Sequence, residues 1–195
     1  MKQDWKPGTM IYPLPAVLVS VGSSPEEYNL ITVAWTGTLC TNPPMCYIAV
    51  RPERHSHAIL MKNMEVVINL TTEDMAFATD WCGVRSGKDY RKFEEMHLTP
   101  GKATVVRCPI VEESPLSIEC RVKEVFSLGS HDLLIADVVN VKADEKYLNA
   151  DGKWDLAQSH PLVYLHGSYY GLGRRIGKFG WSVEKAKPQA GKTEK

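Results

Sequence analysis

YNLITVAWTGTLCTNPP, at residues 28–44, is the stretch that decides the fold. It begins with a Tyr-Asn pair, passes through an apolar strand expected over residues 30–37, and ends in an Asn-Pro-Pro turn. Small and hydroxyl-bearing side chains crowd this strand, among them Thr32, Ala34 and Thr36. A strand built this way exposes its backbone, so a flat ligand can lie against it and bond to main-chain groups.

The rest of the chain is rich in further strands joined by short turns. Besides residues 30–37, strands are expected at residues 16–22, 45–51, 65–70, 117–126, 132–141 and 161–166. The strand at 117–126 alternates, so we expect it to be half buried: Ile118, Cys120 and Val122 face one way, and Ser117, Glu119, Arg121 and Lys123 face the other. This pattern predicts a mainly β protein, a closed or half-closed antiparallel barrel with peripheral helices.

Helical signals are few and short. Ser56 is expected to cap a short helix at 58–61, and Thr72 a second helix that ends near Gly83. A single helical turn is expected at residues 89–94. Residues 1–183 are expected to form one domain, and residues 184–195, which have little apolar content, a disordered tail.

Bulk composition limits the class of partner. The 195 residues are 44% hydrophobic and carry a formal net charge of +0, so no overall field attracts nucleic acid or an anionic membrane. The five cysteines are odd in number and have no C-x-x-C spacing, which favours reduced thiols. No segment approaches the roughly 20 apolar residues of a membrane span. We therefore expect a soluble, cytoplasmic protein.

A set of motifs in fixed order resembles the flavin reductase-like family, whose members are FMN-binding split barrels. The resemblance begins with PAVLVSV (15–21) and the Asn29-x-x-Thr32 strand. It continues along the chain with NPP (42–44) and YIAV (47–50), EVVINL (65–70), DYRKF (89–93), ESPLSIEC (113–120) and GSHDLLIADV (129–138). The closing YYGLGRRIGK (169–178) is similar to the flavoredoxin branch. Together the motifs cover about residues 10 to 182. The resemblance implies a Greek-key antiparallel barrel, bound FMN, redox chemistry and a homodimer with the cofactor near the subunit interface.

The resemblance also suggests a phosphate site. Candidates for the FMN phosphate are Arg51, Arg54, Ser56, His57 and Lys92, with Arg51 at a strand end and Ser56 at a helix start favoured most. A solvated basic loop is the competing interpretation. His55 and His57 do not read as a metal site, because no carboxylate or Cys completes the set at usual spacing.

The ring of FMN needs hydrogen-bonding groups and a flat surface. Backbone groups of Thr32, Ala34, Trp35 and Thr36 are candidates, with Asn29 toward the ribityl chain or phosphate. Cys40 either contacts the flavin or is a small buried hydrophobe. His131, in the hairpin before residue 132, serves the flavin, orients NAD(P)H, or is a plain polar hairpin residue. The segment with Tyr164, Leu165, Tyr169 and Lys178 is expected to line the same pocket.

Three functions follow as hypotheses. The first is an NAD(P)H-dependent flavin reductase, in which reduced flavin passes electrons to a small-molecule or protein acceptor. The second is an electron carrier of the flavoredoxin type, without nicotinamide-dependent turnover. The third is a non-redox barrel that binds another planar ligand or a partner chain.

Overall fold

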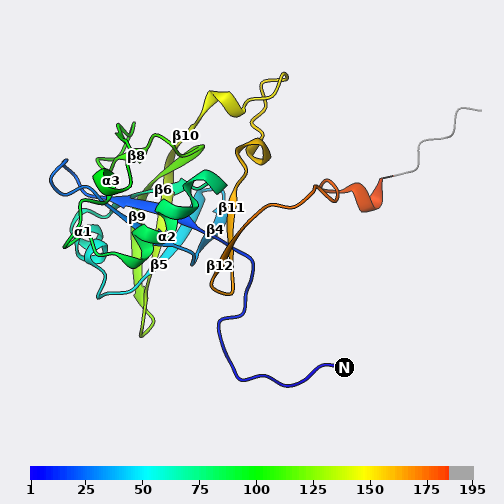
Figure 1. The fold of residues 1–195 in the computed structure, drawn as a ribbon, viewed down its shortest axis with the longest axis horizontal. Coiled ribbons are helices and arrows are strands. Elements are labelled where there is room, and N and C mark those ends of the chain that lie inside the picture. Colours follow the sequence, from blue (N-terminus) through cyan, green and yellow to red (C-terminus); the bar gives the residue numbers. More distant parts are fainter. Residues whose placement is uncertain (185–195) are drawn as a thin grey trace, which may run out of the picture.

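Seven strands form one antiparallel sheet in the computed structural model, which describes residues 1–184 (Figure 1). The sheet order is β3-β2-β6-β9-β10-β5-β4. Their bounds are β2 Val17–Val21, β3 Asn29–Val33, β4 Thr36–Thr41, β5 Pro44–Val50, β6 Glu65–Leu70, β9 Leu116–Ser127 and β10 Asp132–Ala143. β6 is separated from β5 by β9 and β10, a crossover of the Greek-key kind. The predicted mainly β antiparallel fold is confirmed.

Two smaller sheets and three short helices complete the fold. β1 Leu14–Pro15, β11 Leu162–Leu165 and β12 Ser168–Gly171 form a three-stranded sheet, and β7 Pro100–Gly101 pairs with β8 Ile110–Val111. The helices are α1 His55–Asn63, α2 Ala76–Val84, which follows a 3-10 turn at Glu73–Met75, and α3 Lys92–Glu95. α2 and α3 pack against β3 (Figure 1). No helix within residues 1–184 is long and apolar enough to cross a bilayer.

The two edges of the large sheet, β3 and β4, are consecutive in the chain. Residues 34 and 35 join them, and the Trp35 carbonyl accepts the Ala49 backbone N–H at 2.9 Å. The single strand expected at residues 30–37 is therefore wrong in this detail. The strand is interrupted at residue 34, because the segment before it pairs with β2 and the segment after it pairs with β5. The barrel is half closed at this point.

Alternation along each strand fills the barrel interior. The inward-facing core residues are Val17, Val19, Val21, Ile31, Val33, Cys46, Ile48, Val50, Val66, Ile68, Cys120, Val122, Leu134 and Ala136, closed by Leu60 of α1. Because successive strand residues point to opposite faces, these i, i+2 sets share one face. β-Branched side chains predominate in them, as suits a packed pleated surface.

The outer face of β9 is exposed only in part: Arg121 and Lys123 are exposed, as the alternation predicts, whereas Ser117 and Glu119 are buried. The loop 102–108 folds over Glu119, and the buried Ser117 hydroxyl donates to the Asn69 Oδ1 at 2.7 Å. The Glu119 carboxylate accepts backbone N–H groups of Thr104 at 2.8 Å, Val105 at 2.6 Å and Val106 at 3.1 Å. Burial raises the pKa of Glu119, but these hydrogen bonds and one from the Asn140 amide hold it below its ordinary value.

The two expected helix caps are also wrong. α1 begins at His55 after Arg54, and α2 begins after a 3-10 turn, with no side-chain cap bond at the starts of α1 or of that turn. The Ser56 hydroxyl instead accepts a hydrogen bond from the Asn29 amide at 2.8 Å. The expected tail at 184–195 lies outside the described residues, apart from Glu184.

Candidate functional site

Two cavities adjoin each other beside β3. The first, here called the Trp35 cavity, measures about 400 Å³ and is lined by Thr32, Ala34, Trp35, Arg51, His131 and Tyr164, among others. The second, the Ser56 cavity, measures about 290 Å³ and is lined by Ser56, Arg85, Ser86, Gly87 and Lys92, among others. Ile31, Arg54 and Gly83 line both, so the two cavities form one groove.

Helix α2 lies so close to β3 that glycine is needed at the contact. A Cβ on Gly83 would lie 3.1 Å from the Thr32 Cβ, tighter than ordinary packing allows. The Thr32 hydroxyl donates to the Thr79 carbonyl of α2. The side chain of Thr32 is thus used to hold the helix. Since β3 is an edge strand of the large sheet, its backbone groups on the side away from β2 have no partner strand in that sheet.

Trp35 and His131 stack at the mouth of the Trp35 cavity. Their ring centroids are 4.4 Å apart, and the rings are inclined at 35°. Trp35 exposes 37% of its surface. Burial lowers the pKa of His131, and Arg51 lowers it further, so the imidazole is neutral at pH 7.

A second aromatic wall comes from β11 and β12. The rings of Tyr164 and Tyr169 lie 5.6 Å apart, and the Tyr169 hydroxyl donates to the Asp80 carboxylate at 3.2 Å. Burial and the charge of Asp80 raise the pKa of Tyr169 to about 12. Tyr169 therefore stays protonated and remains a hydrogen-bond donor at neutral pH.

The Ser56 cavity gathers positive charge. Arg54, Arg85 and Lys92 line it together with the hydroxyl groups of Ser56 and Ser86. Lys92 is 3% exposed and donates to the Cys82 carbonyl at 2.6 Å. Burial lowers the pKa of Lys92 to about 8, with Arg54 adding to the effect. The arrangement suits a dianionic group such as a phosphate monoester.

Asn29 shapes the Ser56 cavity from behind. Asn29 is buried in β3, and its side-chain amide donates a hydrogen bond to the Ser56 hydroxyl of α1. Gly87 packs against it so closely that a Cβ there would lie 2.2 Å from the Asn29 Oδ1. A side chain at position 87 would therefore displace Asn29 and, with it, Ser56.

Several residues expected at the site lie outside these two cavities. The Thr36 hydroxyl donates to the Tyr47 carbonyl at 2.6 Å, and the His57 Nε2 pairs with the Asp132 carboxylate at 2.7 Å. Cys40, half-buried in β4, lines neither cavity, nor do Leu165 and Lys178. By contrast, the sequence reading overlooked Arg85 and Ser86. The signal for them is the glycine pair, Gly83 and Gly87, that brackets them at the end of α2.

The family model described as "Flavin reductase like domain" matches residues 9–173. The chain belongs to this family. Two solved structures are similar over 94% of this chain and 100% of their own: a flavoredoxin of Desulfovibrio vulgaris (26% identity, TM-score 0.87) and a flavoredoxin from Methanosarcina acetivorans (25%, TM-score 0.83). The resemblance to the family and to its flavoredoxin branch is thus confirmed, as is the split-barrel fold.

One relative of the chain is named as a reductase component. The reductase component of a 4-nitrophenol 4-monooxygenase/4-nitrocatechol 2-monooxygenase of Rhodococcus opacus is 24% identical over 138 residues, which cover 71% of this chain and 64% of that protein. The proteins similar to this chain thus include two named flavoredoxins and one named reductase component.

Proposed function

We propose that this chain binds FMN in the groove made by the two cavities and passes electrons from a donor to a second acceptor. The observation that carries the proposal is the cationic end of the groove: Arg54, Arg85 and Lys92 gather around Ser56. The other end offers edge-strand backbone and aromatic rings. A phosphate at one end and a flat ring at the other match this polarity.

The residues present fit the group. The phosphate carries close to two negative charges at neutral pH, and three cationic side chains and two hydroxyl groups line the Ser56 cavity against a single carboxylate, that of Glu53. The cavity volumes, about 400 and 290 Å³, suit a ligand of this size that lies partly open to solvent. Tyr164 and Tyr169 would flank the ring, and backbone groups of Thr32 and Ala34 would meet its polar edge.

FMN supplies the redox chemistry when bound, because the isoalloxazine ring accepts a hydride and releases electrons singly or in pairs. The protein residues bind, orient and exclude water. Ser56, held by Asn29, and Arg54 fix the phosphate. His131, neutral and stacked on Trp35, offers a flat polar surface beside which a nicotinamide of NADH or NADPH can be oriented.

We also propose a homodimer that covers the mouth of the groove. Trp35 and Val84 line the Trp35 cavity, yet expose 37% and 68% of their surfaces. Apolar side chains exposed beside a polar site are typical of surfaces that a partner covers. Sedimentation of the purified chain should give twice the 21.8 kDa chain mass.

The experiment separates the reductase from the carrier. The purified protein, or the apoprotein reconstituted with FMN, should show a visible flavin band at one flavin per chain. NADH and NADPH oxidation is then followed in the presence of free FMN and of ferric iron. Turnover with either nicotinamide supports the reductase; a bound flavin without turnover leaves the electron carrier, in line with the flavoredoxin likeness. A protein that binds no flavin contradicts the proposal.

A further inference from the structure

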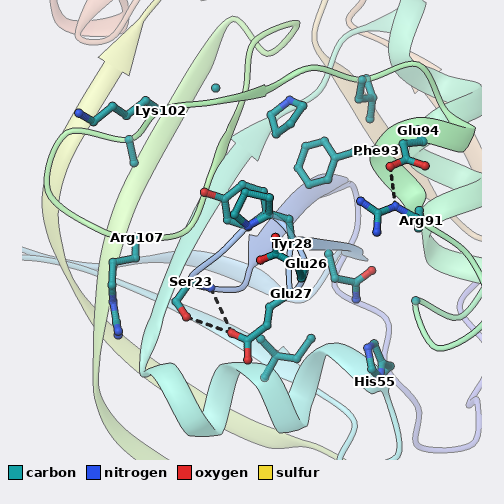
Figure 2. A pocket seen from close by; sticks show the side chains of 18 of the residues that line it. Ser23, Glu26, Glu27, Tyr28, His55, Arg91, Phe93, Glu94, Lys102 and Arg107 are labelled. Carbon is teal, nitrogen blue, oxygen red and sulfur yellow. Dashed lines mark hydrogen bonds and ion pairs between the residues drawn. The ribbon is translucent and has the colours of Figure 1, made fainter.

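Two histidines at the start of α1 have different surroundings. His55 lines a cavity of about 1000 Å³ together with Tyr28 and Glu27 (Figure 2). His57 lines neither this cavity nor the two of the groove, and its Nε2 lies 2.7 Å from the Asp132 carboxylate at the start of β10. Residues two apart in a helix do not face each other, which accounts for the separation. His57 therefore ties α1 to the β9–β10 hairpin.

The Asp132 carboxylate is bonded on both oxygens. Oδ1 accepts the Ser127 hydroxyl at 2.8 Å, and Oδ2 faces His57. The bonds from Ser127 and His57 lower the pKa of Asp132, so the carboxylate is ionised at neutral pH and the His57 Nε2 is the donor. The His57 and Asp132 side chains expose only 14% and 13% of their surfaces, so solvent screens this pair less than an open one.

The helix side of the pair is held firmly. Ser56, which precedes His57, is 2% exposed and accepts the Asn29 amide, and Leu60 in the next turn is fully buried in the core. His57 thus lies between two buried positions of α1. The imidazole therefore has a fixed base from which to bind the hairpin.

The hairpin side has few attachments of its own. Residues 126–130 are all exposed, and His131 lies in the loop before β10 begins. In the part of the chain that the structure describes, the His131 Nδ1 has one hydrogen-bond partner, the hydroxyl of its neighbour Ser130 at 2.9 Å. That bond moves with the loop, so it does not fix the His131 ring relative to Trp35.

We infer that His57 is a positioning residue: through Asp132 it holds the loop, and with it the His131 ring, against Trp35 at the mouth of the groove. Asp132 follows His131 directly in the chain, so a displaced carboxylate displaces the imidazole as well. The consequence for turnover rests on the proposed function, in which His131 orients a nicotinamide. The position of the ring does not depend on it.

The position of His131 can be measured on the apoprotein by NMR of its imidazole protons. The stacked Trp35 indole shifts these protons upfield, and His131→Gln identifies their signals by removing them. His57→Leu, which keeps bulk but has no donor, should lose most of this upfield shift. His57→Gln, whose amide can donate to Asp132, should keep it. Lys123→Leu, on the exposed part of β9, is the matched control and should leave it unchanged.

A second variant and a kinetic measurement support the first. His57→Ser, too short to reach Asp132, should lose the upfield shift as His57→Leu does, and it decides the question if His57→Leu does not fold. In the FMN-loaded protein, both variants should raise the Michaelis constant for the nicotinamide about three- to tenfold. The turnover number and the FMN dissociation constant should stay within about twofold.

The outcomes separate this inference from the proposed function. An upfield shift retained in His57→Leu or His57→Ser overturns the inference. An equal loss of the shift in His57→Gln also overturns it, because the cause would then be the shape of the imidazole and not its N–H. A fall in FMN affinity with His131 unmoved would assign His57 to the phosphate instead. If neither nicotinamide is oxidised, the proposed reductase fails, while the His131 signal still decides the inference.

Discussion

The two ends of the groove are built by different means. At the Ser56 end, polar groups are fixed by buried hydrogen bonds: Asn29 holds Ser56 at 2.8 Å, and Lys92 bonds the Cys82 carbonyl at 2.6 Å. At the Trp35 end, rings stack on rings, and the Trp35 surface is 37% exposed. A pre-organised polar end suits a charged group that stays in place, whereas a stacked aromatic end can adjust to a second molecule that comes and goes.

A side chain at position 87 should produce the largest loss of FMN affinity, because it disturbs the hydrogen-bonded Ser56 end of the groove. In Gly87→Val the new Cβ meets Asn29 Oδ1, so Asn29 and Ser56 must move apart. We expect FMN affinity to fall by about 2–3 kcal/mol, roughly 30- to 160-fold. Isothermal titration measures it.

Gly173→Ala is the matched control, since nothing lies within 4 Å of a Cβ at that position. Unchanged affinity in Gly87→Val would mean that the Ser56 end is not pre-organised, and the contrast between the two ends would be lost.

Lys92 predicts a pH dependence of the fixed end. Its pKa of about 8 lies below the ordinary 10.5, so the ammonium is charged below pH 8 and loses its proton above it. A phosphate binds the charged form, so FMN affinity should fall by up to about tenfold per unit from pH 8 upward. In Lys92→Met the affinity should be lower and flat over this range.

Folding stability changes with pH in the opposite direction to FMN affinity, so the two effects of Lys92 can be distinguished. Between pH 8 and 10.5 the unfolded chain binds more protons at Lys92 than the folded chain. The contribution of this group to folding stability therefore rises with pH in that window. Thermal melts of the apoprotein, with Lys123→Met as control, should show no loss of folding that could imitate weaker binding.

His131→Ala tests the adaptable end. Loss of the stack on Trp35 should cost FMN binding about 0.5–1.5 kcal/mol at most, as for other aromatic pairs. The Michaelis constant for the nicotinamide donor should rise more than the FMN dissociation constant does. The reverse ranking would place His131 on the flavin and make the Trp35 end a cofactor clamp.

Arg51→Ala should have the smallest effect. The Arg51 side chain is 50% exposed and pairs with Glu53 at 3.4 Å, so solvent screens its charge. We expect FMN binding to weaken by about 0.2–1 kcal/mol. A loss of FMN affinity as large as that of Gly87→Val would indicate that Arg51, rather than Arg54, contacts the phosphate.

Much of this fold can be read from the sequence, because alternation and Pro or Gly turns are local signals. Strands such as Glu65–Leu70 and the hairpin before Asp132 lie where the pattern predicts them. The burial of Glu119 could not be read this way, since its donors come from a loop 13 to 15 residues earlier that the pattern leaves undefined.

Sequence patterns and the family resemblance named Thr32, Arg54, Ser56 and Lys92, which line the groove, but did not indicate the contacts that polar side chains make there. Small and basic residues marked both ends of the groove, yet the partner that a polar side chain takes is a matter of tertiary contact. Thr32 bonds a residue 47 positions away, and His57 one 75 positions away. Arg85 joins the cavity only because α2 packs on β3 through Gly83. Such pairings have no local signal.

The most direct test of the flavin groove is a cycle of two ligands and two proteins. FMN and riboflavin, which lacks the phosphate, are titrated onto the wild-type apoprotein and onto Arg54→Ala. The wild type should prefer FMN, and the variant should lose about 1.5–3 kcal/mol of that preference while its riboflavin affinity changes little. Equal binding of FMN and riboflavin by the wild type, or an equal loss of both ligands in Arg54→Ala, would contradict a phosphate held at the Ser56 end.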